Sequence, residues 1–250
     1  MDEEKSLRLS VIIPAYNEAE RISTTLLSAD KYLSGQAYSY EILVVIDGAK
    51  DNTEQIVTEF AKTIEHLRLV SNKQNHGKGY VVRQGMLEAK GQWRLFMDAD
   101  GATPVSFVED MWPLADRGYK VIISSRDSKD AAGARQVVKQ PFLKRLLGNV
   151  ANILIQVVGV WGIWDTQNGF KMFHEEAAVR IFSVARIDRW GFDIEALALA
   201  RKFGYRIGII GIEWKNDARS HVTMGGYVNT FVELFKIRLN LLRGAYEPQP

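Results

Sequence analysis

Two carboxylates one residue apart follow a short apolar run in the stretch from Leu95 to Pro104, LFMDADGATP. Asp98 and Asp100 would point to the same side of an extended segment, because side chains alternate along it. The two charges repel each other unless a cation lies beside them. Paired hard oxygen donors suit Mg²⁺ or Mn²⁺, which take few protein carboxylates and fill their shell with phosphates and water. Asp98 and Asp100 are therefore candidate metal ligands, with a helix cap or a turn as the structural alternative.

Other phosphate-binding and metal-binding patterns do not fit the nearby glycines. In the loop 75–79, NHGKG, a dinucleotide fingerprint would need a third glycine where Val82 stands. The P-loop pattern fails because Asn72 stands in place of its first glycine. An EF-hand is excluded as well, since Ala102 occupies the third ligand position counted from Asp98.

Short β-branched runs precede the residues that could do chemistry. We expect strands at residues 9–13, 41–46, 67–70, 93–97 and 120–125. Amphipathic helical patterns lie between them, at 18–33 and 53–64. This alternation predicts an α/β fold with a mostly parallel central sheet flanked by helices on both faces. Ligands bind such sheets outside the carboxyl ends of the strands, so we expect one site there. The loops that would form it are 14–18, 47–53, 75–79 and 98–101.

Composition narrows the class of protein. A chain of 250 residues that is 46% hydrophobic and 25% charged can close one good-sized core. A net charge of +2 argues against a nucleic-acid partner that relies on bulk positive charge. The lack of cysteine excludes disulfides and thiolate metal sites and fits a reducing compartment. The N-terminal stretch MDEEKSLRLS lacks the features of a secretory signal, so we expect a cytoplasmic protein.

Six motifs taken in order resemble the inverting family 2 glycosyltransferases. They are VIIPAYNEAERI (11–22), VVIDGAKDNT (44–53), NHGKGYVVRQGMLEAKG (75–91), DADGAT (98–103), DTQNGFK (165–171) and RWGFDIE (189–195). The resemblance spans about residues 9–222 and is strongest to the dolichyl-phosphate glucosyltransferase branch of the polyprenyl-phosphate enzymes. It implies a GT-A fold over 1–222, and metal-dependent, inverting transfer of a hexose to a polyprenyl or dolichyl phosphate. UDP-glucose is the favoured donor, GDP-mannose is next, and Mg²⁺ or Mn²⁺ is the implied cofactor.

The resemblance also implies which residues bind the nucleotide. Pro14, Tyr16 and Glu18 would border the base and ribose. The full set carried over is Pro14, Tyr16, Glu18, Asp47, Lys78, Arg83 and Asp98. Asp47 would bind the base, although Ile46 stands where the family usually has a first aspartate.

A phosphate acceptor needs positioning cations more than it needs a base. With a second pKa of about 6, a phosphate monoester is mostly a dianion at neutral pH. Arginine suits such an acceptor because its fork binds two phosphate oxygens. We expect Arg126, Arg145 and Lys139 to bind it, with Lys144 as a weaker candidate. The residues predicted to be catalytic are Asp98, Asp100, Arg126 and Asp193.

The last two motifs supply polar residues for the donor sugar. The predicted sugar-binding residues are Asp165, Gln167, Lys171 and Trp190, the last by stacking on the sugar face. In relatives that act on a sugar hydroxyl, a carboxylate in this neighbourhood is the general base. We assign Asp193 mainly to sugar binding or orientation, and Glu195 to an ordinary position on a helix face.

Two segments have the pattern of helices at a membrane surface. Residues 139–164 run from basic to apolar and include Trp161 and Trp164, with a buried core helix as the alternative. The segment 223–250 is expected to be a C-terminal amphipathic helix. Its apolar stripe would contain Tyr227, Phe231, Leu234, Leu241 and Leu242, with Arg238 in the middle. We expect peripheral attachment to the cytoplasmic face of a membrane, directly or through a partner.

Two other functions fit the same motifs. One is a soluble family 2 glycosyltransferase that acts on a glycan hydroxyl with Asp193 as its base. The other is a nucleotide-sugar-binding protein without turnover.

Overall fold

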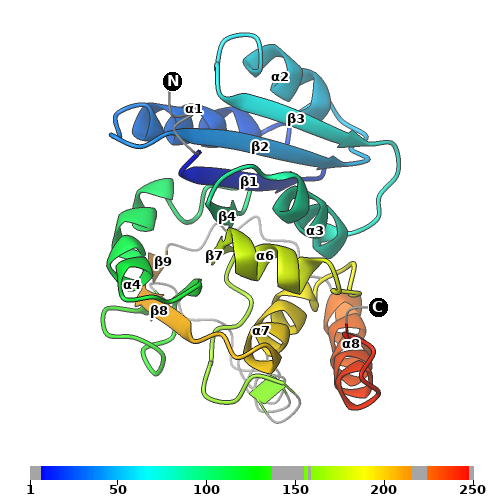
Figure 1. Ribbon diagram of the computed structural model, residues 1–250. Coiled ribbons are helices and arrows are strands. Elements are labelled where there is room, and N and C mark those ends of the chain that lie inside the picture. The colour runs from blue at the N-terminus through cyan, green and yellow to red at the C-terminus, as the bar shows by residue number, and fades with distance from the viewer. Residues whose placement is uncertain (1–6, 137–154, 157–158, 215–223, 248–250) are drawn as a thin grey trace, which may run out of the picture.

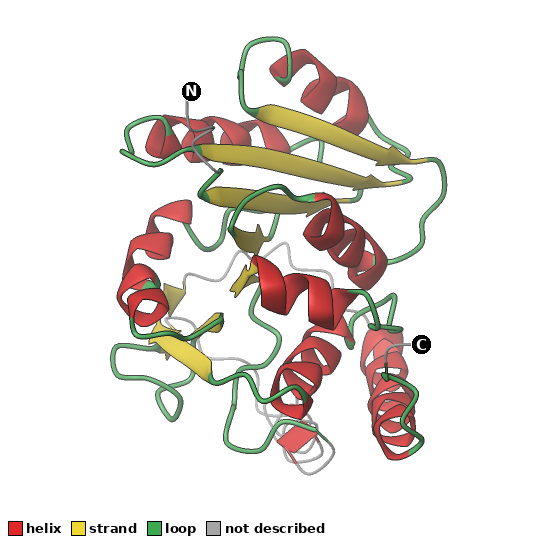
Figure 2. Cartoon of the chain, viewed as in Figure 1, coloured by secondary structure: helices red, strands yellow, loops and turns green. Residues whose placement is uncertain are grey.

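The computed structural model describes residues 7–136, 155–156, 159–214 and 224–247. Its centre is a seven-stranded sheet in the order β3-β2-β1-β4-β7-β5-β8 (Figures 1 and 2). The strands are β1 Leu9–Ala15, β2 Tyr40–Asp47, β3 Leu67–Asn72, β4 Trp93–Met97, β5 Val121–Ser125, β7 Phe170–His174 and β8 Ile207–Gly211. All neighbours are parallel except β7, which runs antiparallel to both β4 and β5. The predicted, mostly parallel sheet is confirmed. A small second sheet pairs β6 Arg135–Gln136 with β9 Glu213–Trp214.

Helices cover both faces of the sheet, as predicted (Figure 1). One face packs against α3 Lys78–Glu88, α6 Glu175–Phe182 and α7 Phe192–Lys202. The other face packs against α1 Ile22–Leu33, α2 Thr53–Phe60, η1 Val105–Asp110 and α4 Trp112–Asp116. The C-terminal helix α8, Met224–Leu242, adds Leu234 and Ile237 to the first of these cores. No helix in the described residues is both long and apolar enough to span a bilayer.

Alternation along the strands explains why both faces are apolar. On β1, Ile12 belongs to the core under α3, whereas Val11 and Ile13 belong to the core under α1. Successive side chains on a strand point to opposite faces, so a strand buried on both sides needs a continuous apolar run. That requirement accounts for the uninterrupted β-branched runs in the sequence.

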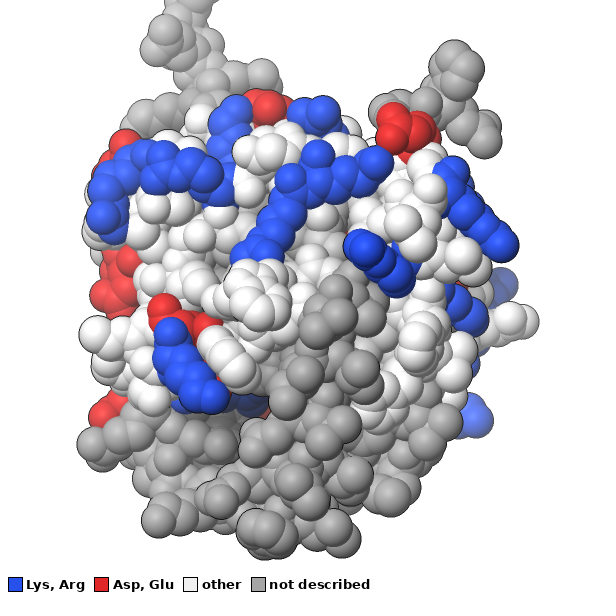
Figure 3. All heavy atoms as spheres, turned by 90° about the horizontal axis from the view of Figure 1, so that it is seen from below, with Lys and Arg blue, Asp and Glu red and all other residues white. Residues whose placement is uncertain are grey.

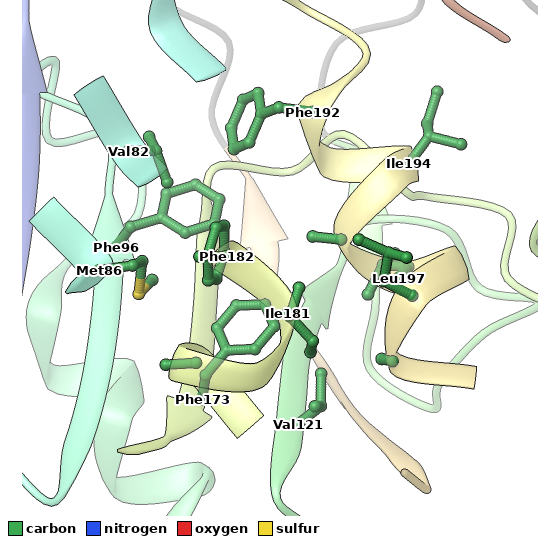
Figure 4. Close-up of a cluster of buried hydrophobic side chains, with 14 of the residues drawn as sticks. Val82, Met86, Phe96, Val121, Phe173, Ile181, Phe182, Phe192, Ile194 and Leu197 are labelled. Carbon is green, nitrogen blue, oxygen red and sulfur yellow. The ribbon is translucent and has the colours of Figure 1, made fainter. Parts of the chain in front are cut away.

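The core under α3, α6 and α7 fixes the helices that reach the site. Figure 4 shows Val82 of α3, Phe96 of β4 and Phe192 of α7 lying close together, with Ile181 and Leu197 farther along the same cluster. The ring centroids of Phe96 and Phe192 are 5.6 Å apart. Because α3, β4 and α7 share this core, their ends are held in fixed relative positions.

The loops expected to carry the chemistry meet at one edge of the sheet. Parallel strands β1, β2, β4 and β5 all end there. Strand β7 begins there, since it is antiparallel and pairs Phe170 with Met97. The loop 165–169 that precedes β7 therefore lies beside the loop 98–101 that follows β4.

Candidate functional site

The predicted carboxylate pair lies in a tight turn at the end of β4. The backbone N–H of Asp98 donates to the Gly169 carbonyl at 3.1 Å. Gly101, with φ of 65°, closes the turn, and the N–H of Ala102 donates to Asp100 Oδ1 at 3.0 Å. A Cβ on Gly169 would lie 2.0 Å from Asp98 Oδ2, so only glycine leaves room for this carboxylate. The loop before β7 thus shapes the place where Asp98 sits.

Lys78, the first residue of α3, lies against this pair. Its Nζ is 2.5 Å from Asp98 Oδ1 and 5.6 Å from the centroid of the Trp190 ring. Burial alone would lower the pKa of Lys78. Nearby carboxylates outweigh burial and raise this pKa above its ordinary value; they belong to Asp98, Asp193 and Asp100. Lys78 is therefore a firmly charged cation at the place where a diphosphate would approach the pair.

The loop after β1 adds a further carboxylate. Glu18 binds Arg21 at 2.6 Å, and its backbone N–H donates to Thr53 Oγ1 at 2.7 Å. Burial raises the pKa of Glu18, and the charges of Asp100 and Asp98 raise it further. The charges of Asp100 and Asp98 therefore act on Glu18, and its contact with a nucleotide stays a prediction. Pro14 is buried in β1 and Tyr16, next along the loop, is exposed.

Asp47, at the end of β2, holds the glycine-rich loop. Its carboxylate accepts hydrogen bonds from Asn75 Nδ2 at 2.9 Å and from the backbone N–H groups of His76 and Gly77 at 2.7 and 2.9 Å. Gly77 has φ of 110°, which favours glycine. Asp47 is only 2% exposed. It fixes the backbone beside the nucleotide site, and its direct contact with a base stays a prediction.

Arg126 and Asp165 form one unit in the structure. The side chain of Arg126 donates two hydrogen bonds to the Asp165 carboxylate, each 2.8 Å, and its backbone N–H donates a third at 2.8 Å. Burial opposes both charges, but mutual attraction lowers the pKa of Asp165 and raises the pKa of Arg126. Asp130, which sequence reasoning missed, accepts from the backbone N–H groups of Trp164 and Asp165 at 2.8 Å each.

Asp193 and Lys171 form a second, deeper pair. Lys171 Nζ is 2.5 Å from Asp193 Oδ1 and 2.5 Å from the Asn168 carbonyl oxygen. Lys171 is 0% and Asp193 3% exposed. Burial raises the pKa of Asp193, while Lys171 and Lys78 oppose this effect. Lys171 was predicted to touch the sugar; its ammonium group is buried against Asp193 and the Asn168 carbonyl, and its contact with a sugar stays a prediction.

Trp190 and Gln167 lie at the surface beside these pairs. Trp190 is 44% exposed, and its carbonyl accepts from Gln167 Nε2 at 3.3 Å. An exposed indole next to Lys78 is suited to stack on a sugar ring, as predicted.

Arg83 points to a different set of groups. Its guanidinium binds Asp188 at 2.7 Å and the Ala185 carbonyl at 3.3 Å, so it ties α3 to the segment before α7. Its predicted contact with a nucleotide stays a prediction. The other predicted acceptor cations, Lys139, Lys144 and Arg145, lie outside the described residues.

Glu195 differs from the ordinary helix-face residue expected of it. It is fully buried, and its carboxylate accepts from the backbone N–H groups of Arg186 and Ile187 and from the Tyr246 hydroxyl. No local sequence pattern predicts this role, because the partners of Glu195 come from a preceding turn and from the C-terminal segment.

The residues present fit a divalent cation of the Mg²⁺ or Mn²⁺ kind. In the described part of the chain, no three His, Cys, Asp or Glu side chains are arranged as a complete metal site. Asp98 and Asp100 would supply two oxygen ligands, and phosphate oxygens with water would supply the rest, as these ions prefer. Burial is the largest cause of the raised pKa of Glu18, and the charges of Asp100 and Asp98 add a smaller rise.

Comparison with known sequences agrees with the motifs. Residues 10–182 match the family described as Glycosyl transferase family 2. The dolichyl-phosphate beta-glucosyltransferase of Dictyostelium discoideum is 35% identical over 254 residues, covering 97% of this chain and 77% of the relative. The Homo sapiens protein of the same name is 31% identical over 256 residues, covering 96% and 77%.

Solved structures show the same fold. Glucosyl-3-phosphoglycerate synthase from Mycobacterium tuberculosis, in complex with Mn²⁺, uridine-diphosphate and phosphoglyceric acid, is similar with a TM-score of 0.69 at 19% identity, covering 92% of this chain and 78% of that one. S. aureus TarS in complex with UDP-GlcNAc is similar with a TM-score of 0.56 at 18% identity, covering 93% and 67%. The predicted GT-A fold is confirmed.

The family match covers most of the chain, and relatives above 30% identity align with nearly all of it. The predicted family is therefore confirmed, and this chain is a glycosyltransferase that belongs to glycosyl transferase family 2.

Proposed function

We propose that this enzyme transfers a hexosyl group from a nucleotide-diphosphate sugar to dolichyl phosphate or a related polyprenyl phosphate. Relatives that align with almost the whole chain are named dolichyl-phosphate beta-glucosyltransferases. Their name favours glucose as the sugar, and UDP-glucose is the donor we propose first, with GDP-mannose next.

The observation that carries this proposal is the closed pair of Asp193 and Lys171. A hydroxyl acceptor needs a carboxylate that is free to take its proton, and Asp193 was the candidate for that role. In the structure its Oδ1 lies 2.5 Å from Lys171 Nζ and only 3% of the residue is exposed. A phosphate acceptor, which is already mostly a dianion, needs no such base. The geometry therefore supports transfer to a phosphate over transfer to a glycan hydroxyl.

The proposed reaction is a single displacement. An oxygen of the acceptor phosphate forms a bond to the anomeric carbon of the sugar while the bond from that carbon to the diphosphate breaks. The electron pair of the broken bond leaves with the nucleoside diphosphate. Attack from the opposite face inverts the anomeric configuration, so an α-linked donor gives a β-linked product.

Different charged groups would act on the two anions, which are the leaving diphosphate and the acceptor phosphate. Asp98 and Asp100 would hold the divalent ion, which when bound supplies positive charge to the diphosphate leaving group. Lys78 would contribute a second positive charge on the same side. Arg126, oriented by Asp165, would position the acceptor phosphate. Asp193 would orient the sugar, with Trp190 stacked on its face.

We propose that the outer face of α8 attaches the enzyme to the membrane surface that holds its lipid acceptor. The exposed apolar side chains are Val232, Phe235, Leu239 and Leu242. Their spacing places them on one stripe of the helix. Exposed Lys236, Arg238 and Arg243 accompany them on the same helix and its end, a combination that suits anionic lipid head groups.

Seen from below relative to Figure 1, the described residues show more Lys and Arg than Asp and Glu side chains (Figure 3). An anionic surface would be attracted on that side. The cytoplasmic side of the membrane is our prediction from the sequence.

An assay with detergent-dispersed dolichyl phosphate, Mn²⁺ and labelled UDP-glucose or GDP-mannose tests the function. We expect label to move to the lipid phosphate with a β linkage, and a chelator to stop the transfer. Transfer only to a sugar hydroxyl would support the glycan-acting alternative. Tight binding of the nucleotide sugar without any transfer would support the alternative without turnover.

A further inference from the structure

We refer to residues 185–191, the last part of the connection between α6 and α7, as the wall. It carries Trp190, whose ring centroid lies 5.6 Å from Lys78 Nζ. Its carbonyl groups meet the start of α3: the backbone N–H of Tyr80 donates to the Asp188 carbonyl at 3.0 Å. A Cβ on Gly79 would lie 2.4 Å from the Ile187 carbonyl oxygen. The wall and the start of α3 are therefore in close backbone contact.

Glu195 binds the backbone at the first residues of this wall. Its Oε2 accepts from the backbone N–H of Ile187 at 2.9 Å, and the N–H of Arg186 donates to both carboxylate oxygens at 3.0 Å. A third group, the hydroxyl of Tyr246, donates to Glu195 Oε1 at 2.6 Å. Tyr246 is 0% exposed and lies beyond the end of α8. The C-terminal segment thus completes the hydrogen bonding of a buried carboxylate two residues from Asp193.

Glu233, on α8, holds the other end. Its Oε2 accepts from the backbone N–H of Gly191, directly before α7, at 2.7 Å. A Cβ on Gly191 would lie 3.0 Å from the Glu233 side chain, so the glycine allows this close approach. Glu233 is 8% exposed. Neither Glu233 nor Tyr246 belongs to the six motifs found in the sequence, and neither has a part in the proposed chemistry.

We propose that Glu233 and Tyr246 are positioning residues, through which the C-terminal helix sets the sugar-binding wall of the donor site. Glu233 fixes Gly191, between Trp190 and Phe192, and Tyr246 supports the turn at 186–187 through Glu195. The nucleotide side depends on them less directly, because Asp47 also holds the loop 75–77 with its own hydrogen bonds. The proposal rests on the proposed function for the roles of Trp190 and Asp193 toward the sugar.

The test compares the dissociation constants of UDP-glucose and of UDP for wild type and variants, with thermal unfolding recorded for each. Glu233→Ala should weaken UDP-glucose binding and lower kcat/KM by about 10-fold or more, because a displaced wall misplaces the sugar. UDP binding should change little. Glu233→Gln should recover most of the loss, since its amide oxygen still accepts from Gly191. The ratio to compare is the affinity for UDP-glucose divided by the affinity for UDP. Tyr246→Phe should lower this ratio as well.

Matched controls separate positioning from general stability. Glu247→Ala removes an exposed carboxylate that pairs with Lys202 on the same C-terminal segment, and Tyr38→Phe removes a tyrosine-to-carboxylate hydrogen bond in the other core. Both should leave the ratio unchanged. Equal weakening of UDP and UDP-glucose, an unchanged ratio in Glu233→Ala, or failure of Glu233→Gln to recover would each overturn the proposal. A wild-type enzyme that binds no nucleotide sugar would overturn the proposed function and this inference together.

Discussion

Three carboxylates at the site each lie within 2.8 Å of a cation and form an ion pair with it. We expect the solvent exposure of each pair to set its role. The pair of Lys78 and Asp98 retains 21% and 36% side-chain exposure, so both groups can exchange partners when a charged ligand arrives. Lys171 and Asp193 are closed off from solvent. The Arg126 and Asp165 pair lies between these extremes. We therefore expect the Lys78–Asp98 and Arg126–Asp165 pairs to meet the charged groups of the ligands. The Lys171–Asp193 pair is fixed, and Asp193 would orient the sugar from that fixed position.

Asp100→Asn should abolish metal-dependent transfer, lowering kcat/KM by at least about 100-fold. One of the two oxygen ligands loses its charge, while removal of that charge relieves repulsion with Asp98 and Glu18, so the fold should not be weakened. Activity with Mn²⁺ and thermal unfolding check both parts. Asp116→Asn, which neutralises an exposed acid on α4, is the control. Unchanged turnover in Asp100→Asn would remove the metal assignment.

Lys171→Met should destabilise the fold by about 3–5 kcal/mol, because it leaves the charge of Asp193 buried without a partner. Adding Asp193→Asn should restore part of the stability, since no buried charge then remains. Urea unfolding measures both. Lys62→Met, which breaks an exposed pair with Glu59, should cost far less. A loss no larger than that of Lys62→Met would show that the buried pair does not matter for stability.

At the scale of elements, helix α6 begins with a titratable cap. His174 ends β7, and its Nδ1 accepts from the backbone N–H of Glu176 at 3.4 Å. Burial and the charge of Lys120 lower the pKa of His174 below its ordinary value of 6.5. A neutral imidazole is required for this cap, because a protonated Nδ1 cannot accept a hydrogen bond.

Stability should therefore fall as the pH is lowered through the region of this histidine. The unfolded chain binds the proton more readily than the folded one, so the contribution is complete above pH 6.5 and is lost as pH falls through the lower folded pKa. Urea unfolding between about pH 5 and 8 measures it. His174→Asn keeps a capping side chain without titrating, and its stability should depend less on pH. Parallel curves for both proteins would contradict the prediction.

Over the whole molecule, α8 has two apolar faces, one packed on the core and one exposed. In the stripe predicted from periodicity, Leu234 is buried in the core. Phe231 and Leu241 of the same stripe are partly buried beside it. Leu242, placed in that stripe, is instead 70% exposed and belongs to the outer face. Trp161, predicted to lie at an interface, is 72% exposed. The exposed apolar side chains of α8 therefore lie on its outer face and only in part on the predicted stripe.

Phe235→Asp and Leu242→Asp should each weaken binding to vesicles that contain anionic phospholipid, by about 10-fold or more. Burial of such a side chain contributes about 1.5–3 kcal/mol, which these variants lose. Vesicle sedimentation at two salt concentrations measures it. Leu27→Asp, at an exposed leucine of α1, is the matched control. Equal losses in all three variants, or none in the α8 variants, would argue against attachment through this face.

Local patterns predicted much of the fold and part of the site. All five predicted strands are present because a buried strand needs an apolar run that is visible in its own sequence. The predicted helix at 18–33 begins only at Ile22, since the preceding residues form a turn in which the N–H groups of Arg21 and Ile22 both bond to the Glu18 carbonyl. The insertion of antiparallel β7 between β4 and β5 was not predicted, because strand order depends on pairing between distant segments.

The sequence by itself determined the family, the sheet and the residue types that gather at its carboxyl edge. Only the tertiary structure decided how those residues pair: it buried Lys171 against Asp193, joined Arg126 to Asp165, and connected Glu233 to Gly191 and Tyr246 to Glu195. The physical reason is the range of the forces involved. Hydrophobic periodicity reports preferences of residues that are near one another in the chain. Desolvation and ion pairing depend on contacts that form only when distant segments pack together.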